Sequence, residues 1–218
     1  MAVRIDVISD VVCPWCFIGK RRLESALKLL RGRFDPAPDV EIVWHPFQLN
    51  PDLPVEGIER SEYLARKFGS RAQDIYGRVS SVGLSVGIDF AFERIVRQPN
   101  TVAAHQLIAI AQDEGRQEEI VETLFHAYFL EGVDLTRTDN LLALAERAGL
   151  PREVARSGLE DDARRQAVAA ADDQARALGV TGVPFFIFDR RLAVSGAQEP
   201  EVLARAISEA ALEPAEER

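Results

Sequence analysis

Apolar positions near the start of the chain predict a strand, a helix and a second strand. A short apolar run predicts a buried strand over residues 3–9, and apolar residues at helical spacing predict a helix over residues 14–31. Gly32 and a proline-containing loop follow this helix, as is common at helix ends. A further apolar run predicts a strand over residues 40–45, parallel to the first if the helix is a right-handed crossover.

From about residue 56 to residue 178 the apolar spacing is helical almost throughout. The helices predicted in this block span residues 62–68, 72–79, 101–113, 118–130, 138–148 and 159–178. Strand patterns return after it, with a strongly apolar strand over residues 183–188, a turn, and a second strand over residues 192–195. These two strands predict an antiparallel hairpin. A last helix is predicted over residues 200–212, and the acidic residues 213–218 are expected to fray.

Composition narrows the kinds of partner. The chain has 218 residues and a net charge of −9, which argues against nucleic acid and anionic membranes because both call for basic patches. No apolar run approaches the roughly 18 residues that would indicate a membrane span. The first residues also lack the basic and apolar regions of a secretory signal. We therefore expect a cytoplasmic protein.

The two cysteines of the chain stand two residues apart, at Cys13 and Cys16, with Pro14 and Trp15 between them. They lie where the first strand meets the first helix, a pattern typical of a dithiol/disulfide redox site. The positive end of a helix favours a thiolate, and proline suits the first helical position. We expect Cys13 at the N-cap, as the more exposed thiol, and Cys16 one turn deeper. In a reducing compartment a structural disulfide is not expected, which favours a catalytic or redox-sensing pair.

Two simpler interpretations compete with a redox site. A zinc site needs about four ligands, but the chain has no second cysteine pair, and His45, His105 and His126 are scattered without ligand spacing. We therefore expect no metal. The cysteines could also be two inert core residues, although a proline between them and a tryptophan beside the second make this less favoured.

The order of elements is βαβ, a helical block, then ββα. Without the block, this is the thioredoxin arrangement with the cysteine motif after its first strand. We thus predict an α/β protein with a thioredoxin-like fold (βαβ–ββα) and a large all-helical insertion. Residues 1–55 and 179–218 would form a discontinuous thioredoxin-like domain, and residues 56–178 the inserted helical domain.

Several motifs resemble those of one family. They span nearly the whole chain and occur in the same order as in that family. They are Ser9-Asp10-Val11-Val12-Cys13-Pro14-Trp15-Cys16-Phe17-Ile18-Gly19, Phe47-Gln48-Leu49-Asn50-Pro51, Pro99-Asn100-Thr101, Ala104-His105 with Leu107, Gly182-Val183-Pro184-Phe185-Phe186 and Ser195-Gly196-Ala197-Gln198. The chain resembles the DsbA family of the thioredoxin superfamily, in its FrnE-like branch. That branch includes 2-hydroxychromene-2-carboxylate isomerases and kappa-class glutathione transferases, which usually have a serine where this chain has Cys13. Some FrnE-like members have a second cysteine pair, which this chain lacks.

The resemblance implies that the Val183–Pro184 bond is cis, beside the cysteine motif, and that it presents the backbone of Val183 to a substrate. Local sequence alone does not predict this, because only about 5–6% of bonds before proline are cis. We expect Cys13, at the helix tip, to be the nucleophile, because only a thiolate attacks a disulfide, and Cys16, set deeper, to be the resolving thiol.

For the other candidate site residues, the sequence allows either a role in the site or a purely structural role. Pro14 and Trp15 would set the redox potential and contact substrate, although Trp15 could be only a surface aromatic. Asn100 and His105 could line the substrate cleft, or be a helix cap and a core histidine. A structural role is favoured for His45, and a core or interface role for His126.

A basic run on the first helix, Lys20, Arg21 and Arg22, would favour the thiolate or an anionic substrate such as glutathione. Alternatively it is a solvated helix face. The sequence does not decide between these.

The leading hypothesis is an enzyme, a DsbA-like disulfide oxidoreductase that exchanges the Cys13–Cys16 pair with a protein or glutathione-like thiol. No metal or organic cofactor is required, and glutathione is the candidate co-substrate. The alternative is a glutathione-dependent isomerase or transferase on the same fold, in which Cys13 only orients bound glutathione. A redox-sensing interaction module is the third hypothesis. Monomer and homodimer both stay open.

Overall fold

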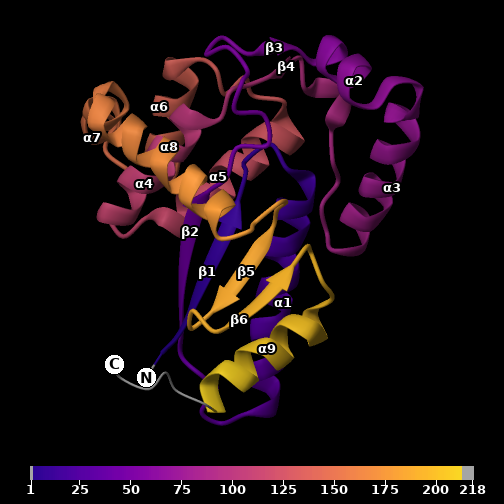
Figure 1. The fold of residues 1–218 in the computed structure, drawn as a ribbon, viewed down its shortest axis with the longest axis vertical. Coiled ribbons are helices and arrows are strands. Elements are labelled where there is room, and N and C mark those ends of the chain that lie inside the picture. Colours follow the sequence, from indigo (N-terminus) through magenta and orange to yellow (C-terminus); the bar gives the residue numbers. More distant parts are fainter. Residues whose placement is uncertain (1, 213–218) are drawn as a thin grey trace.

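The computed structural model describes residues 2–212, and Figure 1 shows their arrangement. The fraying predicted for residues 213–218 lies outside the described residues. A four-stranded sheet runs through the lower half of the view, and most of the helices between β2 and β5 lie above and beside it. Within the described residues, no helix is long and apolar enough to cross a membrane.

The sheet has the strand order β2-β1-β5-β6. Its strands are β1 (Val3–Ser9), β2 (Val40–Pro46), β5 (Phe185–Phe188) and β6 (Leu192–Ser195). β1 pairs with β2 in parallel, and with β5 antiparallel, while β5 and β6 form the predicted hairpin. β5 begins two residues later than predicted, because Pro184 has no N–H to give to a ladder.

Two helices flank the strands. α1 (Pro14–Arg33) connects β1 to β2, and α9 (Pro200–Leu212) packs against α1 and the sheet. Apolar side chains from β1, α1 and α9 are fully buried in one continuous core. The α/β fold class predicted from the order of elements is thus confirmed.

The block between β2 and β5 is mainly helical. Its longer helices are α2 (Arg60–Phe68), α3 (Ala72–Ser85), α4 (Val102–Asp113), α5 (Gln117–His126), α6 (Thr138–Arg147), α7 (Arg152–Glu160) and α8 (Asp162–Ala177). A π-helical turn, Ala127–Glu131, follows α5, and 3-10 turns occupy Gly69–Arg71 and Phe92–Arg94. A small ladder pairs β3 (Ile58–Glu59) with β4 (Arg97–Gln98). Strands of two residues are too short to show an alternation of apolar and polar residues, so the sequence did not predict this ladder.

The single helix predicted over residues 159–178 is wrong, because α7 and α8 are separate helices. Asp161 has extended backbone angles, φ −80° and ψ 108°, and its carboxylate accepts a hydrogen bond from the N–H of Ala163 at 2.8 Å. It therefore caps α8. The sequence prediction continued the helical pattern through this cap and missed most of α7.

The helical block is attached to the edge strand β2 by polar contacts. Gln117 of α5 accepts from the N–H of Trp44 at 2.9 Å and donates to its carbonyl at 3.0 Å. The indole N–H of Trp44 donates to Glu118 at 2.8 Å. These bonds satisfy backbone groups that a sheet edge would otherwise leave unpaired. The division into two domains is not tested by this arrangement and stays a prediction.

Candidate functional site

The cysteine motif occupies the turn between β1 and α1. The N–H of Cys13 donates to the carbonyl of Asp10 at 3.0 Å, and the N–H of Cys16 donates to the carbonyl of Cys13 at 3.0 Å. Cys13 is the N-cap, with extended angles φ −93° and ψ 111°, and Pro14 is the first helical residue. The local geometry predicted from the sequence is therefore present.

Both thiols are free and buried, with 4% of Cys13 and none of Cys16 exposed. The two cysteines differ in their surroundings more than in their exposed surface. The Sγ of Cys13 lies 3.6 Å from the carbonyl oxygen of Val183, to which the thiol can donate. Both cysteines belong to the core cluster that contains Phe17 and Ile18, and Cys16 is the one with no exposed surface. Cys13 is thus the thiol that meets a second segment of the chain.

The bond between Val183 and Pro184 is cis, as the resemblance implies. Gly19 allows α1 to lie close to it: a Cβ at this position would lie 2.8 Å from Cγ of Pro184 and 3.3 Å from Cζ of Phe186. Such a contact is too short for ordinary packing. Gly19 therefore has a packing role in the site. Its place in the cysteine motif alone did not indicate this role.

Burial raises the pKa of the Cys16 thiol well above its ordinary value, and the neighbouring Cys13 raises it further. Hydrogen bonds from the Ser9 hydroxyl and the Asp10 N–H act in the opposite direction without reversing the shift. Cys16 is accordingly held as a neutral thiol at neutral pH. This state suits a second thiol that reacts only after the first.

Asp10 and His105 face each other behind the motif. Asp10 is fully buried, and one carboxylate oxygen accepts from the N–H of Leu49 at 2.8 Å. Its other oxygen lies 3.4 Å from Nε2 of His105, which is also buried. Within residues 2–212, neither of these two atoms has a hydrogen-bond partner. His105 also lines a cavity of about 200 Å³ between β2, α4 and α8.

The side chain of Asn100 is engaged locally. Its oxygen accepts from the N–H of Val102 at 3.0 Å, and its nitrogen donates to the carbonyl of Leu53 at 2.8 Å. The N-cap of α4 is Thr101, so Asn100 is not the cap itself but the residue before it, and its side chain accepts from the first N–H of the helix. Contact of Asn100 with a substrate stays a prediction.

Trp15 is the exposed aromatic residue of the motif, with 39% of its surface accessible, and Pro14 beside it is half-buried. A half-exposed aromatic ring next to a reactive thiol can pack against an incoming molecule. Their contact with substrate is not tested and stays a prediction.

His45 and His126 both lie in ion-pair networks. Nε2 of His45 lies 2.6 Å from the carboxylate of Asp6. His126 lies 2.9 Å from Glu131, and its side chain is 40% exposed, so of the two expected roles the core role is wrong and the interface role stays a prediction.

The basic run on α1 is neutralised by carboxylates. Only 4% of the Lys20 side chain is exposed, and its Nζ lies within 3.0 Å of three carboxylates, those of Glu24, Glu118 and Glu122. Arg21 pairs with Glu122 at 2.5 Å, and Arg22 with Glu199 at 2.6 Å. These residues join α1 to α5 and to the loop before α9, and they are not a solvated helix face.

The family profile for the DSBA-like thioredoxin domain matches residues 4–208. The chain belongs to this family. A relative in Bacillus subtilis (strain 168), "Uncharacterized protein YwbO", is 30% identical over 96% of this chain and 98% of its own length. The crystal structure of the probable DsbA oxidoreductase SCO1869 from Streptomyces coelicolor has a TM-score of 0.87 and 31% identity, over 99% of this chain and 93% of that one.

A more distant structure shares the fold alone. It is the cytosolic disulfide reductase DsbM from Pseudomonas aeruginosa with GSH, at 15% identity and a TM-score of 0.62, over 94% of this chain and 98% of that one. The resemblance to the DsbA family that the motifs indicated is confirmed by these matches. The roles of the individual site residues are not.

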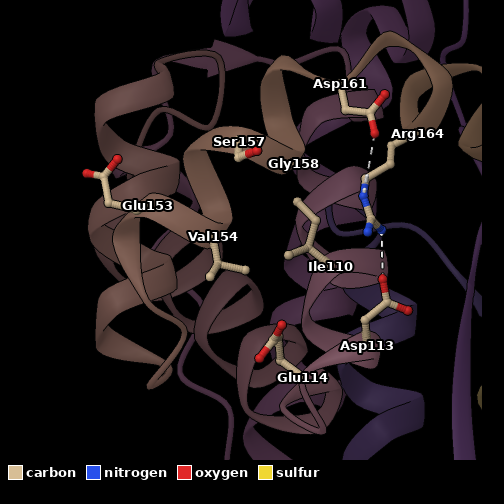
Figure 2. Close-up of a pocket in the computed structure, with 9 residues that line it drawn as sticks. All are labelled: Ile110, Asp113, Glu114, Glu153, Val154, Ser157, Gly158, Asp161 and Arg164. Carbon is tan, nitrogen blue, oxygen red and sulfur yellow. Dashed lines mark ion pairs between the residues drawn. The ribbon is translucent and has the colours of Figure 1, made fainter.

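A larger cavity than the one beside His105 lies elsewhere in this DSBA-like domain. It has a volume of about 570 Å³, and Figure 2 shows Glu153, Ser157 and Gly158 on one side and Asp113 and Arg164 on the other. It contains no cysteine or histidine, and none of the predicted site residues lines it. Nor does any group of three potential metal ligands exist among residues 2–212. The thiols therefore remain the best candidate for chemistry in this DSBA-like domain.

A further buried group of the same domain was missed by the sequence analysis. Arg60, only 7% exposed, donates to Gln98 and, at 2.7 Å, to the hydroxyl of Tyr76. These partners are 38 and 16 positions away in the sequence, so no local pattern could have indicated them.

Proposed function

We propose that the protein is a thiol–disulfide oxidoreductase in which Cys13 is the nucleophile and Cys16 the resolving thiol. The observation that carries the proposal is the position of Cys13. It caps α1, where the helix dipole favours a thiolate, and its Sγ faces Val183 beside the cis bond to Pro184. Membership of the DSBA-like family supports the same chemistry.

The exchange needs only the two sulfurs. In the reducing direction the Cys13 thiolate attacks one sulfur of a substrate disulfide, forming a mixed disulfide and releasing the other sulfur as a thiolate. Cys16 then loses its proton and attacks the Cys13 sulfur. This step forms the Cys13–Cys16 disulfide and releases the second substrate thiolate. Two electrons pass to the substrate, and the reverse sequence oxidises a dithiol.

The structural contrast between the thiols supports this order of events. The pKa of Cys16 is raised by burial, so a free Cys16 is a poor nucleophile at neutral pH. Once Cys13 has formed a mixed disulfide, its negative charge is gone and it no longer raises the pKa of Cys16. Cys16 is then the nearest thiol to the bond that must be broken.

Glutathione is the small thiol that we propose as a partner, and a reducing, cytoplasmic location is part of the same proposal. The similarity of fold to DsbM, a cytosolic disulfide reductase whose structure was determined with GSH, supports both. No metal or organic cofactor takes part, because the electrons are held by the sulfur pair.

Reduction of insulin by the protein, with dithiothreitol as electron donor, tests the proposal. We expect the wild type to accelerate precipitation of the insulin B chain, and Cys13→Ser to abolish the acceleration. Full activity in Cys13→Ser would overturn it. Activity that appears only with added glutathione and persists in Cys13→Ser would instead favour the glutathione-dependent isomerase or transferase.

A further inference from the structure

Arg60 is a buried cation that has no carboxylate partner among residues 2–212. It is the first residue of α2, and its guanidinium donates to Oε1 of Gln98 and to the hydroxyl of Tyr76. Its Cζ lies 5.3 Å from the ring of Tyr63 and 5.1 Å from that of Tyr76. All of these partners are uncharged.

This arrangement is unusual on physical grounds. Removing a guanidinium from water costs on the order of several kcal/mol. Buried charges are therefore normally paired with an opposite charge. The buried Lys20 follows the rule, with three carboxylates around it. Arg60 does not follow it, because no carboxylate of residues 2–212 pairs with its positive charge.

A second donor beside Arg60 also lacks a partner. Oε1 of Gln98 accepts from Arg60 and, at 3.3 Å, from the hydroxyl of Tyr128, which fixes the orientation of the amide. Its Nε2 is then a buried donor for which the described part of the chain supplies no acceptor. Gln98 is completely buried. The cluster thus offers a charge and an N–H group that an anion could satisfy together.

The cluster is connected to the cysteine motif through packed aromatic rings. Ring contacts lead from Tyr76 to Phe92 at 4.6 Å, from Phe92 to Phe129 at 6.1 Å, and from Phe129 to Phe17 at 6.2 Å. Phe17 directly follows Cys16. α3, which contains Tyr76, contacts α1, and Figure 1 shows it alongside the amino-terminal half of that helix. Burial raises the pKa of Tyr76, and the charge of Cys13 contributes to the same shift.

We infer that Arg60, Tyr76 and Gln98 form a carboxylate-binding subsite for the substrate disulfide that Cys13 attacks. The inference rests on the proposed function and adds the substrate class: a small disulfide that carries a carboxylate. Only a slim charged group can reach a guanidinium that is nine-tenths buried. A carboxylate also fits the planar fork of arginine.

Three small disulfides that differ mainly in charge test the inference on the reduced protein. They are 3,3′-dithiodipropionate, a dianion, bis(2-hydroxyethyl) disulfide, which is neutral, and cystamine, a dication. Each oxidises the Cys13–Cys16 pair by the same two exchange steps and leaves two small thiols. The measurement is the second-order rate of oxidation, followed by acid quench and mass spectrometry.

We expect the Arg60 variants to lose their preference for the dianionic over the neutral disulfide. In Arg60→Met the ratio of the dianion rate to the neutral rate falls about tenfold, the size of effect expected from one charge-assisted hydrogen-bonded pair. Arg60→Lys, which keeps the charge and loses the fork, gives a smaller fall. The matched control is Arg66→Met. Arg66 is exposed on the same helix, pairs with Glu62 and carries the same charge, so its loss changes the ratio by less than about twofold.

Tyr76→Phe is a second variant, which keeps the ring and removes only the hydroxyl, and it is decisive if Arg60→Met does not fold. We expect a fall in the same ratio of about threefold. The inference is overturned if the ratio is the same in wild type and in the Arg60 and Tyr76 variants, or if Arg66→Met changes it equally. The proposed function fails, separately, if none of the disulfides oxidises the wild type or if Cys13→Ser reacts equally fast.

Discussion

The Sγ of Cys13 and the carbonyl oxygen of Val183 are 3.6 Å apart, although 170 positions separate them in the sequence. The antiparallel pairing of β1 with β5 explains this. Ile8 and Phe185 form the last pair of that ladder, so the chain leaves β1 toward Cys13 at the same edge at which it enters β5 from Val183. The sheet thus brings the helix cap and the proline loop together.

Gly19 maintains this contact, and a methyl group there is expected to disturb it. Gly19→Ala places a Cβ 2.8 Å from Cγ of Pro184, which forces the proline loop or α1 to move. We expect insulin reduction to fall about tenfold or more, since small displacements of reacting groups can cost up to about a hundredfold in rate.

Gly32→Ala is the matched control, because Gly32 lies in the same helix and a Cβ there meets no atom within 4 Å. We expect this change to leave activity at the wild-type level, and to leave stability equal or slightly higher. Equal activities of the two alanine variants would contradict the role given to Gly19.

The two thiols are expected to differ in reactivity toward alkylation. Cys16 is fully buried and its pKa is raised, so it stays protonated and shielded in the native protein. Iodoacetamide should modify Cys13 alone at pH 7.5, and both cysteines in denaturant, as peptide mass spectrometry can show. Equal modification of both cysteines in the native protein would contradict this account.

Lys20 is expected to stabilise the contact between α1 and α5 in a pH-dependent way. Burial alone would raise the pKa of Glu122, but hydrogen bonding to Arg21 and the charge of Lys20 hold this pKa below its ordinary value. A depressed carboxyl pKa contributes stability above the unfolded-state pKa, and this contribution is lost as the pH falls through the folded-state pKa.

Lys20→Met should therefore reduce the free energy of unfolding by about 2 kcal/mol at pH 7, with a smaller effect near pH 3.5. Urea unfolding at the two pH values measures this. Lys28→Met, on an exposed part of the same helix, is the control and should change stability by less than about 0.5 kcal/mol. An effect of Lys20→Met that is independent of pH would argue against the ion-pair explanation.

Asp10 is expected to be important for stability as well as for its place behind the motif. Asp10→Ala leaves the N–H of the half-buried Leu49 without its acceptor and should cost about 1–2 kcal/mol in urea unfolding. Asp52→Ala, at an exposed loop position, is the control, with less than about 0.5 kcal/mol expected. A similar small effect in both variants would show that the Asp10 carboxylate has no structural role.

The sequence was sufficient for the parts of the fold whose patterns are local. The four strands of the main sheet, α1 and the cap at Cys13 were predicted because apolar runs and the Cys13-Pro14 order act within a few residues. The boundary between α7 and α8 was missed because Asp161 interrupts an otherwise good helical pattern, and only its capping bond reveals the break.

The rest of the site depends on contacts across long sequence separations. Nothing near Arg60 indicates that Gln98 and Tyr76 surround it, and nothing near His105 indicates that it faces Asp10. Lys20 was ambiguous for the same reason, since its carboxylates on α5 are about a hundred positions away. Such groups become evident only when the fold places them together.

The most direct test of the central claim is to trap the mixed disulfide. In Cys16→Ser, treatment with bis(2-hydroxyethyl) disulfide should produce a stable adduct on Cys13, identified by intact mass and by peptide mapping. Cys13→Ser, treated in the same way, should form no adduct on the same time scale. An adduct on Cys16 in Cys13→Ser at an equal rate, or no adduct in Cys16→Ser, would contradict the assignment of Cys13 as the nucleophile.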